Sequence, residues 1–248
     1  MEVEIKKSLL MKAVEPIMLK AFNGVVKIEN GVISVDAIHT NNVSKIFRTI
    51  KDDSIVCKDG GDFFISQDDY ADINKYMGDN LKITEKDGVV VISDGVRELT
   101  TFVNAVDVDI GKKPKIVDGH WVMGNGEKAP VKMVITTGDM AKAKDVISVT
   151  KEDYVEFKIK EDNPYLISGT LEAKSKKYKV GIEVEKEGAR DFIVPAVLID
   201  LISTFNGEKI KIYTVDNPEA PLVMYDYKEH IEGGYIETVY VMSVWKNG

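Results

Sequence analysis

The chain has 248 residues, of which 44% are hydrophobic and 30% charged, and its formal net charge at pH 7 is −8. These values are typical of a globular protein with a proper core, and they exclude a chain that is disordered throughout or that coats nucleic acid with its whole surface. No stretch approaches the roughly 18 apolar residues of a membrane span, so no membrane association is expected. Cys57 is the only cysteine, which excludes an intrachain disulfide and a thiolate metal site and favours a reducing, intracellular location.

Short segments rich in Val, Ile, Thr and Tyr predict strands, and apolar residues at helical spacing predict helices. In chain order the predicted elements are a helix at Ser8–Phe22, a strand at Gly31–Asp36, a helix at Gln67–Met77, strands at Val89–Ser93 and Arg97–Val103, a helix at Asp139–Val149, strands at Tyr154–Ile159 and Tyr178–Val184, a helix at Pro195–Phe205 and a strand at Lys209–Thr214. Pro16 lies inside the first helix and predicts a kink or an early end there.

The order of these elements repeats along the chain. Ser66–Ile83 matches Ile193–Ile212 in pattern, because each contains a strand end, a helix, a glycine turn and an alternating strand with Lys at its centre. The sequence therefore predicts an α+β protein of two similar domains, at residues 1–105 and 130–248. Residues 106–129 are rich in Gly, Lys and Pro and are too long for an ordinary connection, so they are interpreted as an interdomain connector or a functional loop.

Catalytic and metal-binding motifs are missing from the sequence. His39, His120 and His230 are isolated and lack metal-ligand spacing, and no nucleophile elbow or phosphate-cradling glycine loop occurs. We therefore expect no enzyme activity, no catalytic residue, no metal and no cofactor.

Lysines recur on the predicted helices. Lys12, Lys75, Lys142 and Lys144 lie on the first three of them, whereas the fourth has Asp200 and Thr204 on its polar side. Solvated helix faces explain any single lysine. Helices that direct cations into one space would instead form a track for a phosphate backbone, which binds without reading sequence.

Two segments resemble sliding clamps of the proliferating cell nuclear antigen (PCNA) type. Residues 29–47, ENGVISVDAIHTNNVSKIF, are similar to a strand–turn–strand stretch of the family's first domain. Residues 221–244, PLVMYDYKEHIEGGYIETVYVMSV, resemble its closing strands, and the order of elements agrees along essentially the whole chain. The resemblance implies the clamp fold, with two helices packed on antiparallel sheets in each domain.

The resemblance also implies a function. Such clamps are trimeric rings that encircle duplex DNA without reading its sequence and raise polymerase processivity without chemistry of their own. Lys12, Lys75, Lys142 and Lys144 would then lie on or beside the inner wall, and Val96–Val103 and Tyr178–Val184 would be the edge strands that join subunits. The implied partners are a DNA polymerase, a clamp loader and other replication or repair proteins with short clamp-binding motifs. The implied location is the cytoplasm or nucleoid, or the nucleus of a eukaryote.

The family's partners insert a short motif into a groove beside the connector. The matching residues here are mostly apolar, and core packing explains several of them equally well: Ile38, Val43, Ile116, Val117, Pro221, Val239 and Val241.

The chain departs from the family pattern at this groove and its surroundings. Lys45 replaces an apolar residue, His39 an acidic one, Val241-Met242 the usual Ala-Pro, and the connector contains the basic run Lys112–Lys115. These departures indicate a divergent clamp, a heterotrimer subunit, or a clamp-fold interaction hub that does not load on DNA. An enzyme on an unrelated α+β fold remains a third class, and it requires a pocket at His39 or His120 with an acidic partner.

Overall fold

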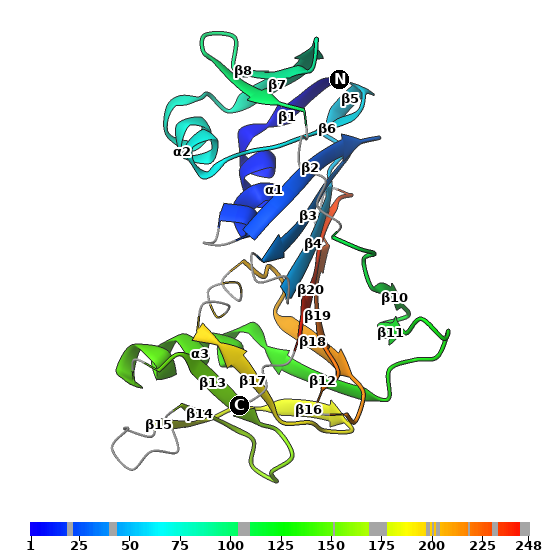
Figure 1. The fold of residues 1–248 in the computed structure, drawn as a ribbon, viewed down its shortest axis with the longest axis vertical. Helices are drawn as coiled ribbons and strands as arrows, with labels where there is room; N and C mark the ends of the chain where they lie inside the picture. The colour runs from blue at the N-terminus through cyan, green and yellow to red at the C-terminus, as the bar shows by residue number, and fades with distance from the viewer. Residues whose placement is uncertain are drawn as a thin grey trace. The chain divides into compact units, whose positions relative to one another are not determined.

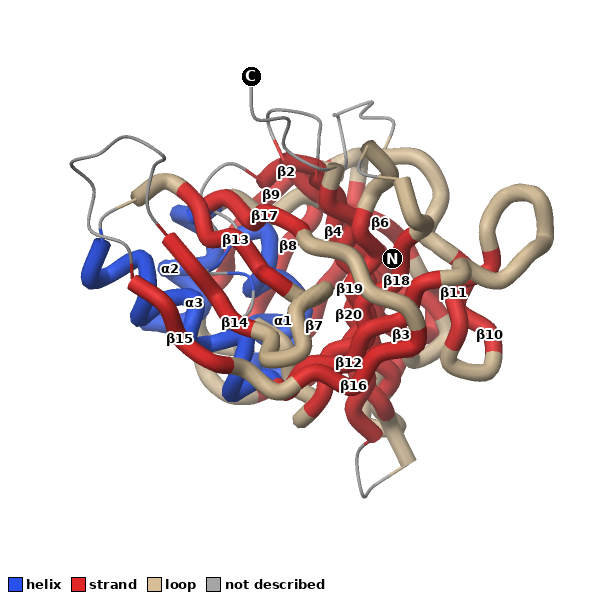
Figure 2. Tube along the Cα trace, turned by 90° about the horizontal axis from the view of Figure 1, so that it is seen from below, coloured by secondary structure: helices blue, strands red, loops and turns tan. Residues whose placement is uncertain are grey.

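The computed structural model describes residues 1–18, 22–39, 44–103, 110–150, 152–168, 178–196, 199, 201, 204–217, 219–229 and 233–243. Strands, drawn in red in Figure 2, dominate over helices, as the α+β prediction requires. The chain divides into two compact units: unit 1 contains Met1–Lys112 and Tyr227–Thr238, and unit 2 contains Lys113–Asp226 and Val239–Gly248. The chain thus returns to unit 1 in its last quarter.

Unit 1 contains two antiparallel sheets. The first has the strand order β5-β1-β7-β8-β9, with β1 at Glu2–Lys6, β5 at Val56–Asp59, β7 at Asn80–Lys86, β8 at Val89–Ser93 and β9 at Glu98–Phe102. The second has the order β6-β2-β3-β4-β20, with β2 at Phe22–Glu29, β3 at Val32–His39, β4 at Ser44–Lys51, β6 at Gly61–Phe63 and β20 at Tyr235–Met242. Asn30-Gly31 and Asp87-Gly88 connect β2 to β3 and β7 to β8 with positive φ at both residues, the backbone that two-residue hairpins favour.

Two helices pack together on unit 1. Helix α1 (Lys7–Met18) contacts β2, β3 and β4 through an apolar face that includes Leu10 and Val14, and α2 (Gln67–Tyr76) lies against α1 (Figure 1). The hydroxyl of Ser66 accepts a hydrogen bond from the Asp69 N–H, and the Asp69 carboxylate accepts one from the Ser66 N–H. This capping box explains why α2 begins where the sequence predicts.

The described part of α1 runs from Lys7 to Met18 with Pro16 inside it, residues 19–21 lie outside the described residues, and Phe22 belongs to β2 instead of the predicted helix. Proline has no N–H, so residue 16 cannot donate to the carbonyl of Lys12 one turn earlier. The buried Arg48 guanidinium of β4 takes over this acceptor: its Nη1 lies 2.8 Å from the Lys12 carbonyl oxygen and 3.6 Å from the Glu15 carboxylate. Its Nε donates to the Thr238 hydroxyl of β20 at 3.1 Å.

Unit 2 also contains two main antiparallel sheets. The first has the order β15-β14-β13-β17, with β13 at Tyr154–Lys158, β14 at Tyr165–Ser168, β15 at Tyr178–Gly181 and β17 at Phe192–Pro195. The second has the order β16-β12-β18-β19-β20, with β12 at Val131–Thr136, β16 at Val184–Glu187, β18 at Lys209–Thr214 and β19 at Leu222–Glu229. Helix α3 (Thr137–Thr150) packs on β12, β13, β14 and β15.

The strand–helix units of the two halves correspond. In unit 1, β1 runs directly into α1 and pairs with β7, the strand that follows α2. In unit 2, β12 runs directly into α3 and pairs with β18. The repeated order therefore corresponds to repeated strand pairing.

Three predicted elements differ from the structure. The predicted strand Tyr178–Val184 is two strands, because β15 ends at Gly181 and Val184 begins β16, which pairs with β12 in the other sheet. Pro195 ends β17 instead of opening a helix, and most of the predicted helix Pro195–Phe205 lies outside the described residues. The predicted connector contains a hairpin, β10 (Lys115–Val117) and β11 (His120–Val122).

We predict that Arg48→Ala destabilises the protein by about 3 kcal/mol, because it removes charged hydrogen bonds and leaves the partly buried Lys12 carbonyl and the buried Thr238 hydroxyl without this partner. Denaturant unfolding measures the change. Arg97→Ala, at an exposed arginine, is the control and should change stability by about 0.5 kcal/mol or less. Equal effects of the two substitutions would contradict the role assigned to Arg48.

Candidate nucleic-acid interface and partner groove

Lys12 is a half-buried residue of α1. Burial lowers the pKa of its ammonium group, and the neighbouring cations Lys228 and Arg48 lower it further, while Glu15 opposes the change. Lys12 thus has two cations, Lys228 and Arg48, and one carboxylate, Glu15, in its surroundings.

Lys75 is exposed in the last turn of α2, where the negative end of the helix dipole stabilises a cation. Its ammonium lies 4.8 Å from the centre of the Tyr76 ring. The Lys7 ammonium, which the sequence reasoning did not select, donates to the Met77 carbonyl at 2.7 Å just beyond the same helix. Lys7 therefore connects the start of α1 to the end of α2.

The two lysines of α3 have different surroundings. Lys142 forms an ion pair with Asp139 one turn earlier and donates to the Gly181 carbonyl of β15 at 3.2 Å. Lys144 is half-buried and also takes part in an interaction within the protein. These contacts hold the Lys142 ammonium beside Asp139 and the β15 backbone.

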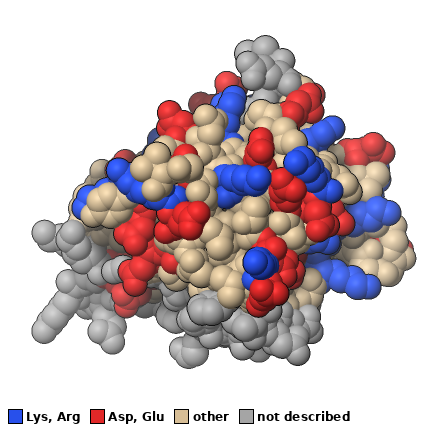
Figure 3. Space-filling model, turned by 90° about the horizontal axis from the view of Figure 1, so that it is seen from above, with Lys and Arg blue, Asp and Glu red and all other residues tan. Residues whose placement is uncertain are grey.

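Acidic residues offset the helix lysines. The three described helices contain five lysines and six carboxylates: Lys7, Lys12, Lys75, Lys142 and Lys144 against Glu15, Asp68, Asp69, Asp72, Asp139 and Asp145. On the face shown in Figure 3, basic side chains in blue are interspersed with acidic ones in red. The described helices are thus nearly neutral as a set.

The fourth predicted helix contributes little to this comparison. Val197 and Asp200 lie outside the described residues. Thr204, expected on the polar side, is instead 3% exposed and donates to the Leu201 carbonyl at 2.8 Å. A hydroxyl that donates to a backbone carbonyl three residues earlier can be buried in this way.

The residues assigned to the partner groove divide by burial. Ile38 in unit 1 and Val239 in unit 2 are core residues, with 6% and 0% of their surface exposed. Within unit 2, Ile116 and Val117 on β10, Pro221 before β19 and Val241 on β20 are half-buried. Val43 lies outside the described residues. Core packing accounts for the first two residues, while the four half-buried ones retain accessible apolar surface.

Strands β9 and β15 are end strands of their sheets among the described residues. The Val103 N–H donates to the Gly88 carbonyl beyond β9, and the Ile182 N–H donates to the Pro164 carbonyl beyond β15. Along an antiparallel strand, every second residue directs its N–H toward the neighbouring strand and the residues between direct theirs away from it. The N–H groups of Glu98 and Thr100 on β9, and of Lys179 and Gly181 on β15, therefore point away from the neighbouring strand.

Asp94 organises the turn that leads into β9. Its carboxylate accepts the backbone N–H groups of Gly78 and Arg97 at 2.7 Å and of Val96 at 2.8 Å. These bonds lower the pKa of Asp94 to about 2, because they stabilise the ionised form. Asp94 also borders a cavity of about 360 Å³ along β1 and β7, which is lined by no histidine.

The described residues offer no group of three His, Cys, Asp or Glu side chains that could hold a metal ion. His39 is buried at the end of β3, and His120 is half-buried on β11. None of the helices in the described part of the chain has the length and apolarity that a membrane span requires.

No protein-family model and no curated protein matches the sequence. Solved structures do match. The chain aligns with PCNA from Entamoeba histolytica at a TM-score of 0.66 and 13% identity, covering 99% of this chain and 98% of that one. It aligns with the DNA polymerase III β subunit from Thermotoga maritima at 0.65 and 14% identity, and with a structure described as that subunit from Eubacterium rectale at 0.67 and 14%. The chain spans 66% and 65% of these two β subunits.

These alignments cover 99% or more of the chain, so the expected clamp fold is confirmed. The two types of clamp structure share its strand-rich arrangement with helices on antiparallel sheets. At 13–14% identity they establish the fold and leave assembly and partners to be tested. The chain has the fold of DNA sliding clamps.

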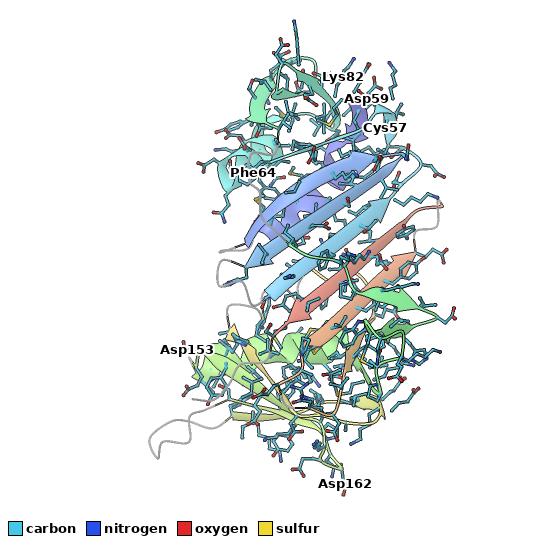
Figure 4. All side chains as sticks on the ribbon, turned by 45° about the vertical axis from the view of Figure 1, so that its right-hand side comes forward. Cys57, Asp59, Phe64, Lys82, Asp153 and Asp162 are labelled. Carbon is cyan, nitrogen blue, oxygen red and sulfur yellow. The ribbon has the colours of Figure 1, made fainter. Side chains whose placement is uncertain are left out.

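We predict that Asp94→Asn lowers the melting temperature at pH 7, because the amide oxygen cannot replace both carboxylate oxygens. A depressed carboxyl pKa gives stability that is complete above the ordinary value of 3.8 and is lost as pH falls toward about 2. The difference between wild type and variant should therefore shrink between about pH 5 and pH 2. Asp162→Asn, at an exposed loop position (Figure 4), is the control, and a pH-independent difference would contradict the prediction.

Proposed function

We propose that this chain is a sliding clamp subunit: a non-enzymatic processivity factor that forms a trimeric ring around duplex DNA and tethers replication and repair proteins. The observation that supports the proposal most strongly is the clamp fold over the full chain, with an end strand in each unit whose outward backbone groups are positioned to pair. Its two domains would be residues 1–105 and 130–248, joined by the connector 106–129.

The two end strands support the assembly. β9 belongs to unit 1 and β15 to unit 2, so β9 of one subunit can pair with β15 of the next and continue around a closed ring. The strands have similar lengths, five and four residues. Glu98 and Lys179 are exposed on them and carry opposite charges. Pairing would also protect two edges that otherwise promote aggregation.

DNA would contact the helix faces through Lys12, Lys75, Lys142 and Lys144. Contacts to phosphates from cations are independent of base sequence, as a ring that slides along DNA requires. Because the helix charges nearly balance, we infer a weaker electrostatic hold on DNA than a uniformly basic wall would give. Lys228 adds a cation near Lys12 that sequence reasoning missed.

Polymerase and clamp loader would bind the partner-groove residues of unit 2 that are not part of the core. The half-buried residues Ile116, Val117, Pro221 and Val241 are the ones with surface left for a partner's side chains. Peptide motifs that insert apolar side chains into such grooves obtain most of their affinity from a few anchors.

Single proline substitutions test the ring. Thr100→Pro on β9, or Lys179→Pro on β15, removes one outward N–H and leaves the hydrogen bonds to the neighbouring strand intact, since an edge strand tolerates proline. We predict that wild type has three times the subunit mass by size-exclusion chromatography with light scattering, and that both variants shift toward monomer. Thr100→Ala and Lys179→Ala, which retain the N–H, should stay trimeric. A wild type that is monomeric at all concentrations contradicts the proposal, unless a different subunit completes the ring.

Charge reversal tests the DNA interface. The triple variant Lys12→Glu, Lys75→Glu, Lys144→Glu should reduce retention on circular DNA and stimulation of processivity at least tenfold, because it converts phosphate contacts to repulsions. Lys6→Glu, Lys86→Glu, Lys160→Glu changes the same charge at exposed positions outside the helices and should leave both within about twofold.

The near-neutral charge of the described helices favours one alternative, a clamp-fold interaction hub that assembles without loading on DNA. For a hub the triple reversal leaves partner binding unchanged, and wild type itself gives no processivity. The same experiment thus separates the two functions.

A further inference from the structure

Asparagine–glycine pairs recur along the chain, at residues 23–24, 30–31, 125–126, 206–207 and 247–248. In such a pair the glycine nitrogen can attack the side-chain carbonyl carbon of the asparagine, because glycine has no side chain that hinders the approach. Closing the five-membered ring requires rotation about the Cα–C bond of the asparagine. All pairs but the last lie within the described residues, and their surroundings differ.

The pair Asn23-Gly24 is held inside β2. Asn23 is paired with Ile38, and Gly24 with Ala37, on the neighbouring strand β3. Gly24 is buried, and a Cβ added to it would lie 2.8 Å from the Ala37 Cβ, so the two strands are in close contact there. Strand pairing and close packing resist the rotation that ring closure needs.

The pair Asn125-Gly126 lies in an exposed turn, where hydrogen bonds hold both reacting groups. The Gly126 N–H donates to the Met123 carbonyl at 2.9 Å. The Asn125 amide donates to the Glu127 carboxylate at 2.8 Å, and its oxygen accepts from the Glu127 N–H at 3.0 Å. Attack would break these bonds, so we expect a slow reaction.

The pair Asn206-Gly207 is half-buried and is held in the same way. The Gly207 N–H donates to the buried Asp226 carboxylate at 2.8 Å, and the Asn206 N–H donates to its other oxygen at 2.7 Å. The Asn206 side-chain amide donates to the Thr204 carbonyl at 2.9 Å. Here too, both reacting groups must first lose a hydrogen bond.

The pair Asn30-Gly31 differs from these three. It forms the two-residue turn between β2 and β3, and Asn30 is exposed. In such a turn the last hydrogen bonds of the ladder are made by the flanking residues, Glu29 and Val32, so the Gly31 N–H faces solvent. Within the described part of the chain, no hydrogen bond involves this N–H or the Asn30 side chain. Both reacting groups are therefore accessible and unrestrained.

We propose that Asn30 is a site of spontaneous deamidation in the folded protein. The Gly31 nitrogen gives its proton to hydroxide and attacks Asn30 Cγ, and Nδ2 leaves as ammonia, which forms a succinimide ring. Water then opens the ring: attack at Cγ gives aspartate, and attack at the backbone carbonyl carbon gives isoaspartate, whose main chain runs through Cβ and Cγ. In total, one amide and one water become one carboxylate and one ammonium ion. This inference does not rest on the proposed function.

Isoaspartate would disturb the turn. It adds one carbon to the main chain, whereas the length of the loop fixes the register of a hairpin. Both β2 and β3 pack against α1, so a loosened register weakens that contact. The new carboxylate also lies next to Glu29, whose own partner is the Lys27 ammonium at 2.9 Å. Molecules that contain isoaspartate are therefore less stable, and each has one more negative charge.

Ageing of the purified chain tests the site. Wild type is incubated at mildly alkaline pH, both folded and in urea, and peptide mapping by mass spectrometry follows each pair. In the folded chain we expect Asn30 to react at least tenfold faster than the asparagines of the other three described pairs, and in urea we expect all four rates to agree within about threefold. Asn30→Gly keeps a compatible two-residue turn and removes the site. The proposal is overturned if Asn30 is not the fastest in the folded chain, or if the same order of rates persists in urea.

Thermal unfolding tests the effect on the turn. Aged wild type should contain a fraction with a lower melting temperature, in proportion to its isoaspartate, and Asn30→Gly aged in the same way should not. Asn30→Asp carries the new charge on a normal main chain and should melt close to unaged wild type. An aged wild type that contains isoaspartate but melts like aged Asn30→Gly contradicts the assigned effect.

Discussion

The buried guanidinium of Arg48 joins the helix layer of unit 1 to its sheet. Pro16 prevents α1 from satisfying the Lys12 carbonyl within the helix, and Arg48 satisfies it from β4. The same guanidinium bonds Thr238, which arrives in unit 1 from the far end of the sequence. The position of α1, and of the Lys12 side chain that it carries, therefore depends on residues separated by almost the whole chain.

Hydrogen bonds also fix the orientation of exposed backbone at the end strands β9 and β15. Asp94 holds the turn before β9, so the outward N–H groups of Glu98 and Thr100 have a defined direction. On β15, the hydrogen bond from the Ile182 N–H to the Pro164 carbonyl fixes which N–H groups point outward. An edge that is ordered before it pairs loses less conformational entropy on association, which favours a closed assembly.

The placement of charge distinguishes this chain from a uniformly basic DNA-binding surface. Carboxylates on α1, α2 and α3 offset the helix lysines. A protein organised in this way would hold DNA through ring closure more than through electrostatic attraction.

Local patterns in the sequence determined the α+β class, the N-cap of α2 at Ser66 and strands such as β8 and β18, because capping residues and alternation act over a few residues. Asp118-Gly119 was a hairpin signal of the same kind within the connector, and it was missed. Only the tertiary structure decided that Tyr178–Val184 divides between two sheets, that Val239 and Thr204 are buried, and that Arg48 bonds Lys12. Burial and pairing depend on which distant strands become neighbours, and no local pattern specifies that.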